Sequence, residues 1–208
     1  MTETVRRQYD RAAGAYDRRW AGYVRATLDL LDTHARIGPD ERVLDVGCGT
    51  GTFVRRLVDR NPAQHAVGVD VSAGMLAEAR RKVGAAPNAR FVEAPAEALP
   101  FPDGAFDVVV TASALHYAAR PEAVLAEAAR VLRPGGRLVV LDWDRGRWWM
   151  AALDVALRAF DPAHTHTLSA GELDGMLAGA GFASHAVQQI RRGVWGFAVA
   201  VAYTPDIR

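Results

Sequence analysis

The sequence predicts an α/β fold built on a doubly wound, mostly parallel sheet. Short apolar runs alternate with helical patterns from residue 42 to residue 142, which is typical of parallel strands joined by crossover helices. Half of the 208 residues are hydrophobic, enough for one domain with a full core. The expected strands are Arg42–Val46, His65–Asp70, Ala89–Glu93, Phe106–Thr111 and Arg137–Asp142, and the helices between them fall around Phe53–Arg60, Gly74–Val83 and Pro121–Leu132.

The two ends of the chain differ from this alternating core. Residues 3–35 follow a helical pattern that stops before Gly38 and Pro39, since both residues interrupt a helix. A second helix is expected over Trp148–Phe160, directly after the fifth strand.

The last segment predicts a third helix and a hairpin. Ser169 and Glu172 have the spacing of a capping box at a helix start. Two β-rich runs follow, Ser184–Ile190 and Val194–Tyr203, with a hairpin turn predicted at Arg192-Gly193.

Charge and composition argue against several classes of protein. The 25 basic and 24 acidic residues nearly cancel, so the chain has no net field that would attract nucleic acid. No apolar run has membrane-spanning length, and we expect no integral membrane segment and no secretory signal. The single cysteine, Cys48, cannot form an internal disulfide, which favours a cytoplasmic location. Either a monomer or a homodimer is compatible with the sequence.

The run from Val43 to Thr52 carries the strongest functional signal. It places Gly47, Gly49 and Gly51 at alternate positions between a buried strand and a helix start. Such a turn lets the backbone approach a ligand closely and presents N–H groups to negative charge. A dinucleotide fingerprint would need glycine at position 52, which argues against a nicotinamide dehydrogenase.

This run resembles the first motif of class I S-adenosylmethionine-dependent methyltransferases, in the small-molecule branch of the ubiquinone and menaquinone (type 11) methyltransferases. The resemblance covers residues 40–142 and includes, in the family's order, Glu93–Phe101, Phe106–Thr111 and Val131–Gly136. It implies a Rossmann-like, seven-stranded sheet with an antiparallel C-terminal hairpin. It also implies one domain over residues 1–208, made of a helical lid (1–38), a cofactor-binding core (40–142), a helical substrate-side segment (143–181) and C-terminal strands (182–208).

The resemblance implies a site for S-adenosyl-L-methionine, with S-adenosyl-L-homocysteine as the product. Asp70 would accept hydrogen bonds from the ribose hydroxyls, although capping of the next helix is an alternative. Met75 would lie against adenine or in the core. Pro95 departs from the family by replacing the Asp that meets the adenine amino group. The expected cofactor residues are Tyr16, Asp45, Gly47, Cys48, Gly49, Gly51, Asp70, Val71, Met75, Ala96, Glu97, Thr111 and Ala112.

His116, after the fourth strand, is the candidate catalytic residue. The methyl of a sulfonium is already electrophilic, so a general base is needed only if the acceptor atom carries a proton. The alternative is a histidine bonded to the backbone at a helix start. His164 and His166 form a His-x-His pair that could bind a metal, contact substrate or belong to an ordinary loop. No third ligand has clear spacing, and we expect no metal site.

Aromatic residues are the candidate substrate contacts. Tyr9 and Tyr16 lie on one helical face and resemble the family's lid, with plain packing as the alternative. Trp143, Trp148 and Trp149 follow the fifth strand and would suit an apolar or aromatic acceptor.

The predicted function is therefore methyl transfer from S-adenosylmethionine to an O, N or C atom of a small metabolite. The alternative is a catalytically inactive cofactor-binding or scaffold protein, which Pro95 leaves open. Nucleic-acid methylation is disfavoured, because Thr111-Ala112-Ser113-Ala114 stands where an Asn or Asp would precede Pro-Pro and an aromatic residue.

Overall fold

Seven strands form one sheet in this computed structural model, which describes residues 3–161, 164–165 and 167–206. The strands are β1 (Val43–Val46), β2 (Ala66–Asp70), β3 (Ala89–Glu93), β4 (Phe106–Ala112), β5 (Leu132–Trp143), β6 (Ser184–Arg192) and β7 (Trp195–Tyr203). Their order is β3-β2-β1-β4-β5-β7-β6. The strands from β3 to β5 are parallel, whereas β7 runs antiparallel to both β5 and β6. The predicted fold class is confirmed.

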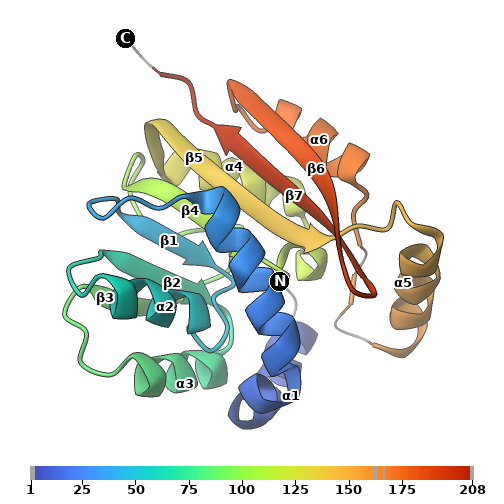
Figure 1. Cartoon of the computed structure of the whole chain (residues 1–208), viewed down its shortest axis with the longest axis horizontal. Coiled ribbons are helices and arrows are strands. Elements are labelled where there is room, and N and C mark those ends of the chain that lie inside the picture. The colour runs from blue at the N-terminus through green and yellow to red at the C-terminus, as the bar shows by residue number, and fades with distance from the viewer. Residues whose placement is uncertain (1–2, 162–163, 166, 207–208) are drawn as a thin grey trace.

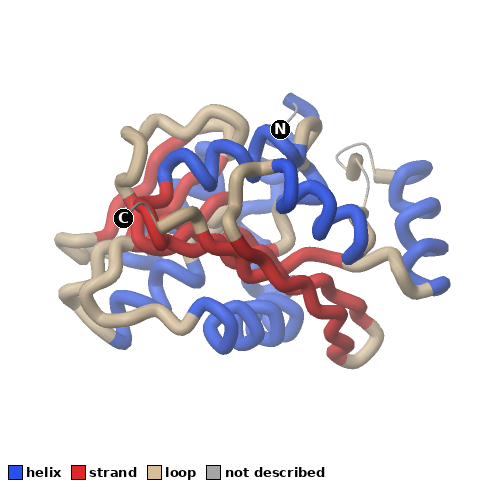
Figure 2. Tube along the Cα trace, turned by 90° about the horizontal axis from the view of Figure 1, so that it is seen from above, coloured by secondary structure: helices blue, strands red, loops and turns tan. Residues whose placement is uncertain are grey.

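Helices cover both faces of the sheet, as Figures 1 and 2 show. The helices of the described residues are α1 (Glu3–Ala35), α2 (Thr52–Arg60), α3 (Ala73–Val83), η1 (Leu115–Tyr117), α4 (Pro121–Val131), α5 (Trp148–Phe160) and α6 (Ala170–Gly179). Of these, α5 lies at the edge of the molecule and not on a face of the sheet (Figure 1). Leu31 of α1 and Leu57 of α2 belong to the core on one face, while Leu125 of α4 and Leu173 of α6 belong to the core on the other. Strand β1 is buried along its whole length, because both of its faces are covered. Within the described residues, no helix is sufficiently long and apolar to cross a membrane.

Helix α1 is anchored at its C-terminal end. Leu28 and Leu31 are buried against the sheet. The guanidinium group of Arg137, in β5, donates to the carbonyl of Ala35, the last residue of α1, at 2.8 Å. The same group forms an ion pair with Glu41, which follows the helix, at 2.7 Å. The N-terminal half of α1 therefore extends from a fixed base across the strand ends.

Two local predictions need correction, and one is confirmed. Strand β5 begins at Leu132 rather than Arg137, because Leu132 pairs with Phe106 across an irregularity in the register. The hairpin turn is Gly193-Val194 rather than Arg192-Gly193, since Arg192 pairs with Trp195 and Gly193 takes a φ of 60°. The capping box of Ser169 and Glu172 is present.

Candidate active site

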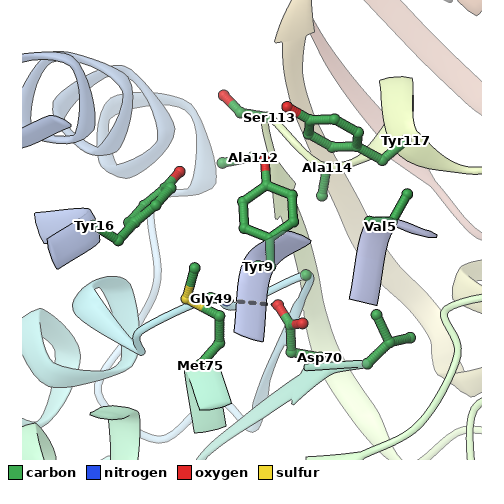
Figure 3. Close-up of a pocket in the computed structure, with 12 residues that line it drawn as sticks. Val5, Tyr9, Tyr16, Gly49, Asp70, Met75, Ala112, Ser113, Ala114 and Tyr117 are labelled. Atoms are coloured by element: carbon green, nitrogen blue, oxygen red, sulfur yellow. Dashed lines mark hydrogen bonds between the residues drawn. The ribbon is translucent and has the colours of Figure 1, made fainter. Parts of the chain in front are cut away.

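A pocket lies at the carboxyl end of the sheet, where the strand order reverses (Figure 3). Strand β1 pairs with β2 on one side and β4 on the other, so the loops after these strands diverge. The pocket contains about 460 Å³ of empty space, part of it open to solvent. We call it the strand-end pocket; it is lined by Val5, Tyr9, Tyr16, Gly47, Gly49, Asp70, Val71, Met75, Ala112, Ser113, Ala114 and Tyr117.

The three glycines after β1 have different roles. A Cβ on Gly49 would meet nothing within 4 Å, so its backbone faces open space in the pocket. A Cβ on Gly47 would come within 2.4 Å of the Cβ of Ala114, so glycine allows the loops after β1 and β4 to approach. A Cβ on Gly51 would lie 2.9 Å from the ring of Phe91. Gly51 therefore serves packing and does not line the pocket.

Asp70 presents a buried carboxylate to the strand-end pocket. One carboxylate oxygen accepts the N–H of Gly49 and the other accepts the N–H of Ser72, each at 2.9 Å. Burial raises the pKa of this carboxyl, while these backbone hydrogen bonds act in the opposite direction. A carboxylate has about four acceptor positions, so two further donors can bind. Asp70 does not cap the next helix, which was the alternative role, because Ser72 caps α3 by accepting the N–H of Met75.

Helix α1 covers the pocket and is held there by two carboxylates. Asp10 accepts the hydroxyl of Ser72 at 2.6 Å and the N–H of Gly74 at 2.9 Å, and these bonds lower its pKa. Asp17 accepts the hydroxyl of Thr50 at 2.6 Å and pairs with the ammonium of Lys82 at 2.5 Å. The two contacts join α1 to the loops after β1 and β2.

A second pocket lies beside the first, between α1 and the segment after β4. It contains about 1170 Å³ of empty space, again partly open to solvent. We call it the helix-side pocket; besides α1 residues, it is lined by Ser113, His116, Tyr117, Trp143 and Asp161. Tyr9, Tyr16, Ser113 and Tyr117 line both pockets, so the two spaces are adjacent.

The tyrosines between the pockets are neutral phenols. The rings of Tyr9 and Tyr16 lie 6.0 Å apart, and that of Tyr9 meets Tyr117 edge-on at 5.4 Å. Burial raises the pKa of Tyr16 to about 12 and raises that of Tyr9 as well. They form an aromatic boundary with hydroxyl groups but no charge.

His116 is held by a carboxylate in the helix-side pocket. Its Nδ1 lies 2.5 Å from a carboxylate oxygen of Asp142, and its backbone N–H donates to the other oxygen at 3.1 Å. The ring stacks on Trp143 with centroids 4.6 Å apart. A carboxylate only accepts, so Nδ1 donates its N–H to Asp142, and in the neutral form of the ring Nε2 carries the lone pair. Nε2 is buried and has no hydrogen-bond partner within the described part of the chain.

The sequence analysis missed several residues that line these pockets or contact their lining. Tyr23 joins α1 to the site, because its hydroxyl lies 2.6 Å from the Ser113 hydroxyl and accepts the indole N–H of Trp143 at 2.6 Å. Ser113 has a φ of 54°, a strained value for a residue other than glycine. Asp142 did offer a signal, since it is an ionisable residue directly after a buried apolar run in β5. The contacts of the others depend on tertiary structure.

The structure brings together part of the predicted cofactor set. The strand-end pocket is lined by the predicted residues Tyr16, Gly47, Gly49, Asp70, Val71, Met75 and Ala112. The lining does not include the predicted residues Asp45, Cys48, Gly51, Ala96, Glu97 and Thr111. Burial raises the pKa of the Cys48 thiol, so this cysteine is a packed, protonated side chain.

Only some of the predicted substrate residues line a pocket. Tyr9, His116 and Trp143 line the helix-side pocket, whereas Trp148 and Trp149 do not. Helix α5 carries Trp148 into solvent, where it is 80% exposed, and the indole N–H of Trp149 donates to the carbonyl of Val194.

His164 is buried behind the pocket lining. It pairs with Asp154 at 2.8 Å, and its ring centroid lies 5.6 Å from that of His116. His166, the other member of the predicted pair, lies outside the described residues.

Comparison with known proteins finds a match to one family model and to curated methyltransferases. Residues 44–140 match the family model described as "Methyltransferase domain". The chain is 46% identical over 128 residues to a demethylmenaquinone methyltransferase of Thermus thermophilus, a match that covers 61% of this chain and 55% of the relative. It is 42% identical over 142 residues to a ubiquinone/menaquinone biosynthesis C-methyltransferase of Stutzerimonas stutzeri, covering 65% of this chain and 52% of the relative. The chain thus spans about half the length of these curated relatives.

Residues 44–140 are thus similar to a methyltransferase domain, and the relatives described above carry the names of quinone methyltransferases. Solved structures agree in fold. One is a SAM-dependent methyltransferase, "possible histamine N-methyltransferase", of Thermotoga maritima, with a TM-score of 0.76 at 24% identity, covering 96% of this chain and 99% of that one. Another is a geranyl diphosphate methyltransferase in complex with GPP and sinefungin, with a TM-score of 0.70 at 19% identity, covering 86% of this chain and 76% of that one.

S-adenosylmethionine is the cofactor that the sequence predicts. The strand-end pocket fits it in two respects. Asp70 keeps acceptor capacity for a vicinal diol after its two backbone bonds, and the space beside Gly49 would be filled by any side chain there. One part of the family pattern is missing, because neither Ala96 nor Glu97 lines the pocket for the adenine ring.

Proposed function

We propose that this chain transfers a methyl group from S-adenosylmethionine to an O, N or C nucleophile of a small, apolar or aromatic acceptor. The observation that carries the proposal is the buried, unpartnered Nε2 of His116 on a ring that Asp142 orients. His116 lines the helix-side pocket, which shares Ser113 and Tyr117 with the strand-end pocket. A proton acceptor therefore lies beside the proposed position of the methyl donor.

Residues of the strand-end pocket would bind the cofactor. When bound, the cofactor supplies an electrophilic methyl group on a sulfonium sulfur. Asp70 would accept hydrogen bonds from the ribose hydroxyls, and Met75 would contact the adenine ring. The backbone of Gly47 and Gly49 permits close approach, and the segment from Ala112 would meet the methionyl end.

His116 would act as the general base. Its Nε2 can take the proton of an acceptor hydroxyl, and the carboxylate of Asp142 stabilises the imidazolium that results. On a hydroxylated aromatic ring, loss of this proton increases the electron density at the oxygen and at ring carbons. In C-methylation the methylated ring carbon then loses its proton and the imidazolium returns a proton to the oxygen. One base can thus serve either O- or C-methylation, and it adds about 10²- to 10⁴-fold to the rate.

The walls of the helix-side pocket suit a planar acceptor. Trp143, Tyr117 and Tyr9 provide aromatic surfaces, and the only buried ring nitrogen without a partner on this lining is that of His116. The names of two relatives, a demethylmenaquinone methyltransferase and a ubiquinone/menaquinone biosynthesis C-methyltransferase, refer to quinones, which are planar ring compounds. We therefore place phenols and hydroquinones first among the acceptors.

Titration calorimetry with S-adenosylmethionine and S-adenosylhomocysteine tests the cofactor site. The wild-type protein should bind both, and Asp70→Ala should lose the ribose contacts and bind at least tenfold more weakly, since hydrogen bonds to a charged group contribute about 1.5–3 kcal/mol. Asp59→Ala is the matched control, because this carboxylate pairs with Arg55 on the surface of α2. Equal binding by wild type and Asp70→Ala would contradict the assignment.

Methyl transfer itself is tested by mass spectrometry with phenols, hydroquinones and amines as acceptors. A product heavier by one methylene unit supports the proposed reaction. Tight cofactor binding without any methylated product would favour the alternative of a cofactor-binding protein without transfer activity.

A further inference from the structure

An apolar surface outside both pockets covers α5 and the tip of the β6–β7 hairpin. On α5, Trp148, Val155 and Phe160 are 80%, 68% and 86% exposed, and Val194 at the hairpin tip is 71% exposed. Among the large hydrophobic side chains exposed in the described residues, only Trp20 and Tyr203 lie elsewhere. Exposed apolar side chains gathered in this way mark an interaction site. We call these four residues, with the arginines described below, the helix–hairpin surface.

The sequence of α5 leaves this face without a partner in the chain. Residues 148, 152, 155 and 159 fall on one helical face and all are exposed, and the exposed Phe160 extends the apolar surface beside that face at the end of the helix. The helix buries only Met150 and Asp154. Figures 1 and 2 show α5 at the edge of the molecule, away from the sheet. The indole N–H of Trp149 donates to the carbonyl of Val194 at 3.0 Å. This bond joins the helix and the hairpin tip into one surface.

Arginines border the apolar side chains. The guanidinium carbons of Arg147 and Arg191 lie 5.4 and 5.7 Å from the ring centroid of Trp149, and Arg192 is exposed at the same tip. None of these three forms an ion pair with a carboxylate of the described residues, unlike Arg145 with Glu172 and Arg158 with Asp154. Because the chain as a whole has a formal charge of only +1, this positive charge is local.

We propose that the helix–hairpin surface binds an anionic phospholipid bilayer. Trp148, Phe160 and Val194 would enter the boundary between headgroups and acyl chains, where such side chains partition favourably. The arginines would meet the anionic headgroups. A second copy of the chain suits the surface less well, since an isologous contact would bring the arginines of both copies together.

Membrane binding would also serve the helix-side pocket. Asp161, the residue directly after α5, lines that pocket. Docking of α5 would therefore bring the pocket close to the bilayer, in which an apolar acceptor dissolves. This inference goes beyond the proposed methyl transfer, and vesicle binding is measured without cofactor or acceptor.

Sedimentation with vesicles tests the proposal. The full chain should bind vesicles of phosphatidylcholine that contain phosphatidylglycerol, bind pure phosphatidylcholine weakly, and dissociate as salt screens the headgroup charge. The variant Arg147→Gln/Arg191→Gln/Arg192→Gln should bind the anionic vesicles roughly 100-fold more weakly. Trp148→Ser/Phe160→Ser should lose binding by about 100-fold as well, because it removes two inserted aromatic groups.

Two control variants separate this surface from general effects. Tyr203→Ser changes an exposed aromatic residue at the far end of β7, and Arg25→Gln/Arg120→Gln removes two exposed charges elsewhere. Both should retain vesicle binding, and circular dichroism should show a native fold for every variant. Binding that ignores anionic lipid, or that survives Trp148→Ser/Phe160→Ser, would overturn the proposal. Light scattering that shows a dimer, lost in this same variant, would assign the surface to self-association instead.

Discussion

At the residue scale, the arrangement of His116 and Asp142 gives the site its chemistry. The two side chains are 2% and 4% exposed, and they come from the segment after β4 and from the end of β5. Because the carboxylate fixes the proton on Nδ1, the lone pair of Nε2 is available without a change of tautomer. The sequence predicted His116 as the candidate base, and the structure adds the pairing with Asp142 that orients its ring.

Replacing either member of this pair should separate catalysis from binding. His116→Ala should lower turnover by about 10²- to 10⁴-fold while the affinity for S-adenosylmethionine stays near that of wild type, because the base acts only on the acceptor. Asp142→Asn should also lower turnover, since an amide can stabilise the wrong tautomer. Steady-state rates and calorimetry with the same protein samples measure both quantities. Unchanged turnover in His116→Ala would remove the base from the mechanism.

The buried carboxyl of Asp45 should make the stability of the fold depend on pH. It is buried, and burial together with the nearby charge of Asp70 raises its pKa to about 7. An unfolded aspartate has a pKa of about 3.9, so the folded state holds the proton more tightly. This group therefore favours folding at low pH, and its contribution is lost as pH rises from about 4 to about 7.

The variant Asp45→Asn isolates that contribution. It is neutral at every pH, so its free energy of unfolding relative to wild type should increase between pH 5 and pH 8 by up to a few kcal/mol. Urea unfolding at both pH values measures the difference. The same pH dependence in both proteins would show that Asp45 does not titrate in this range.

At the scale of the element, α1 has two parts with different attachments. Its C-terminal half is packed through Leu28 and Leu31, whereas its N-terminal half buries the smaller Val5 and Ala13 and is held by the hydrogen bonds of Asp10 and Asp17. Polar contacts near solvent are weaker than buried apolar packing. We therefore expect the N-terminal half to open over the strand-end pocket, and its role as a lid stays a prediction.

Removal of both carboxylates should speed release of the product from the strand-end pocket. In Asp10→Ala/Asp17→Ala, a loss of about 1–2 kcal/mol of closing free energy should raise the dissociation rate of S-adenosylhomocysteine roughly 5- to 30-fold. Stopped-flow displacement measures this rate. Asp29→Ala is the matched control. Asp29 lies on the anchored half of α1, where its carboxylate pairs with Arg56 of α2. An equal increase in the control would show that general loosening of α1, and not the two contacts, is responsible.

At the scale of the whole molecule, the sheet separates two cores. Leu125 of α4 is fully buried in the core on the α4 and α6 face, on the opposite side of the sheet from α1. This core supports the strands without contributing a residue of α4 to either pocket. Stability and ligand binding should therefore respond to different substitutions.

Leu125→Ala tests this separation. The cavity should lower the free energy of unfolding by about 2–5 kcal/mol, a loss of roughly 2–4 °C in Tm for each kcal/mol. Affinity for S-adenosylmethionine should stay unchanged in the folded protein. Val155→Ala, at a position that is 68% exposed, should change stability by less than about 0.5 kcal/mol. A matching loss in both variants would contradict the burial of Leu125. Calorimetric melting and titration on the same samples provide both measurements.

The sequence by itself determined the class of the fold and the centre of the strand-end pocket. Hydrophobic periodicity located the strands, and the positions of Gly47, Gly49 and Asp70 at strand ends indicated where they would converge, because these signals are local. The exact turn at Gly193-Val194 depended on strand register, which local signals define poorly.

Only the tertiary structure decided which distant residues meet. Asp142 contacts His116 across neighbouring loops, Tyr23 reaches Ser113 from α1, and Trp148 turns into solvent on α5 instead of lining a pocket. These outcomes depend on the relative placement of helices and strands, which no pattern within a short segment encodes. Local sequence patterns thus indicate the residues at the ends of β1 and β2, whereas the helix-side pocket and the helix–hairpin surface result from the packing of distant segments.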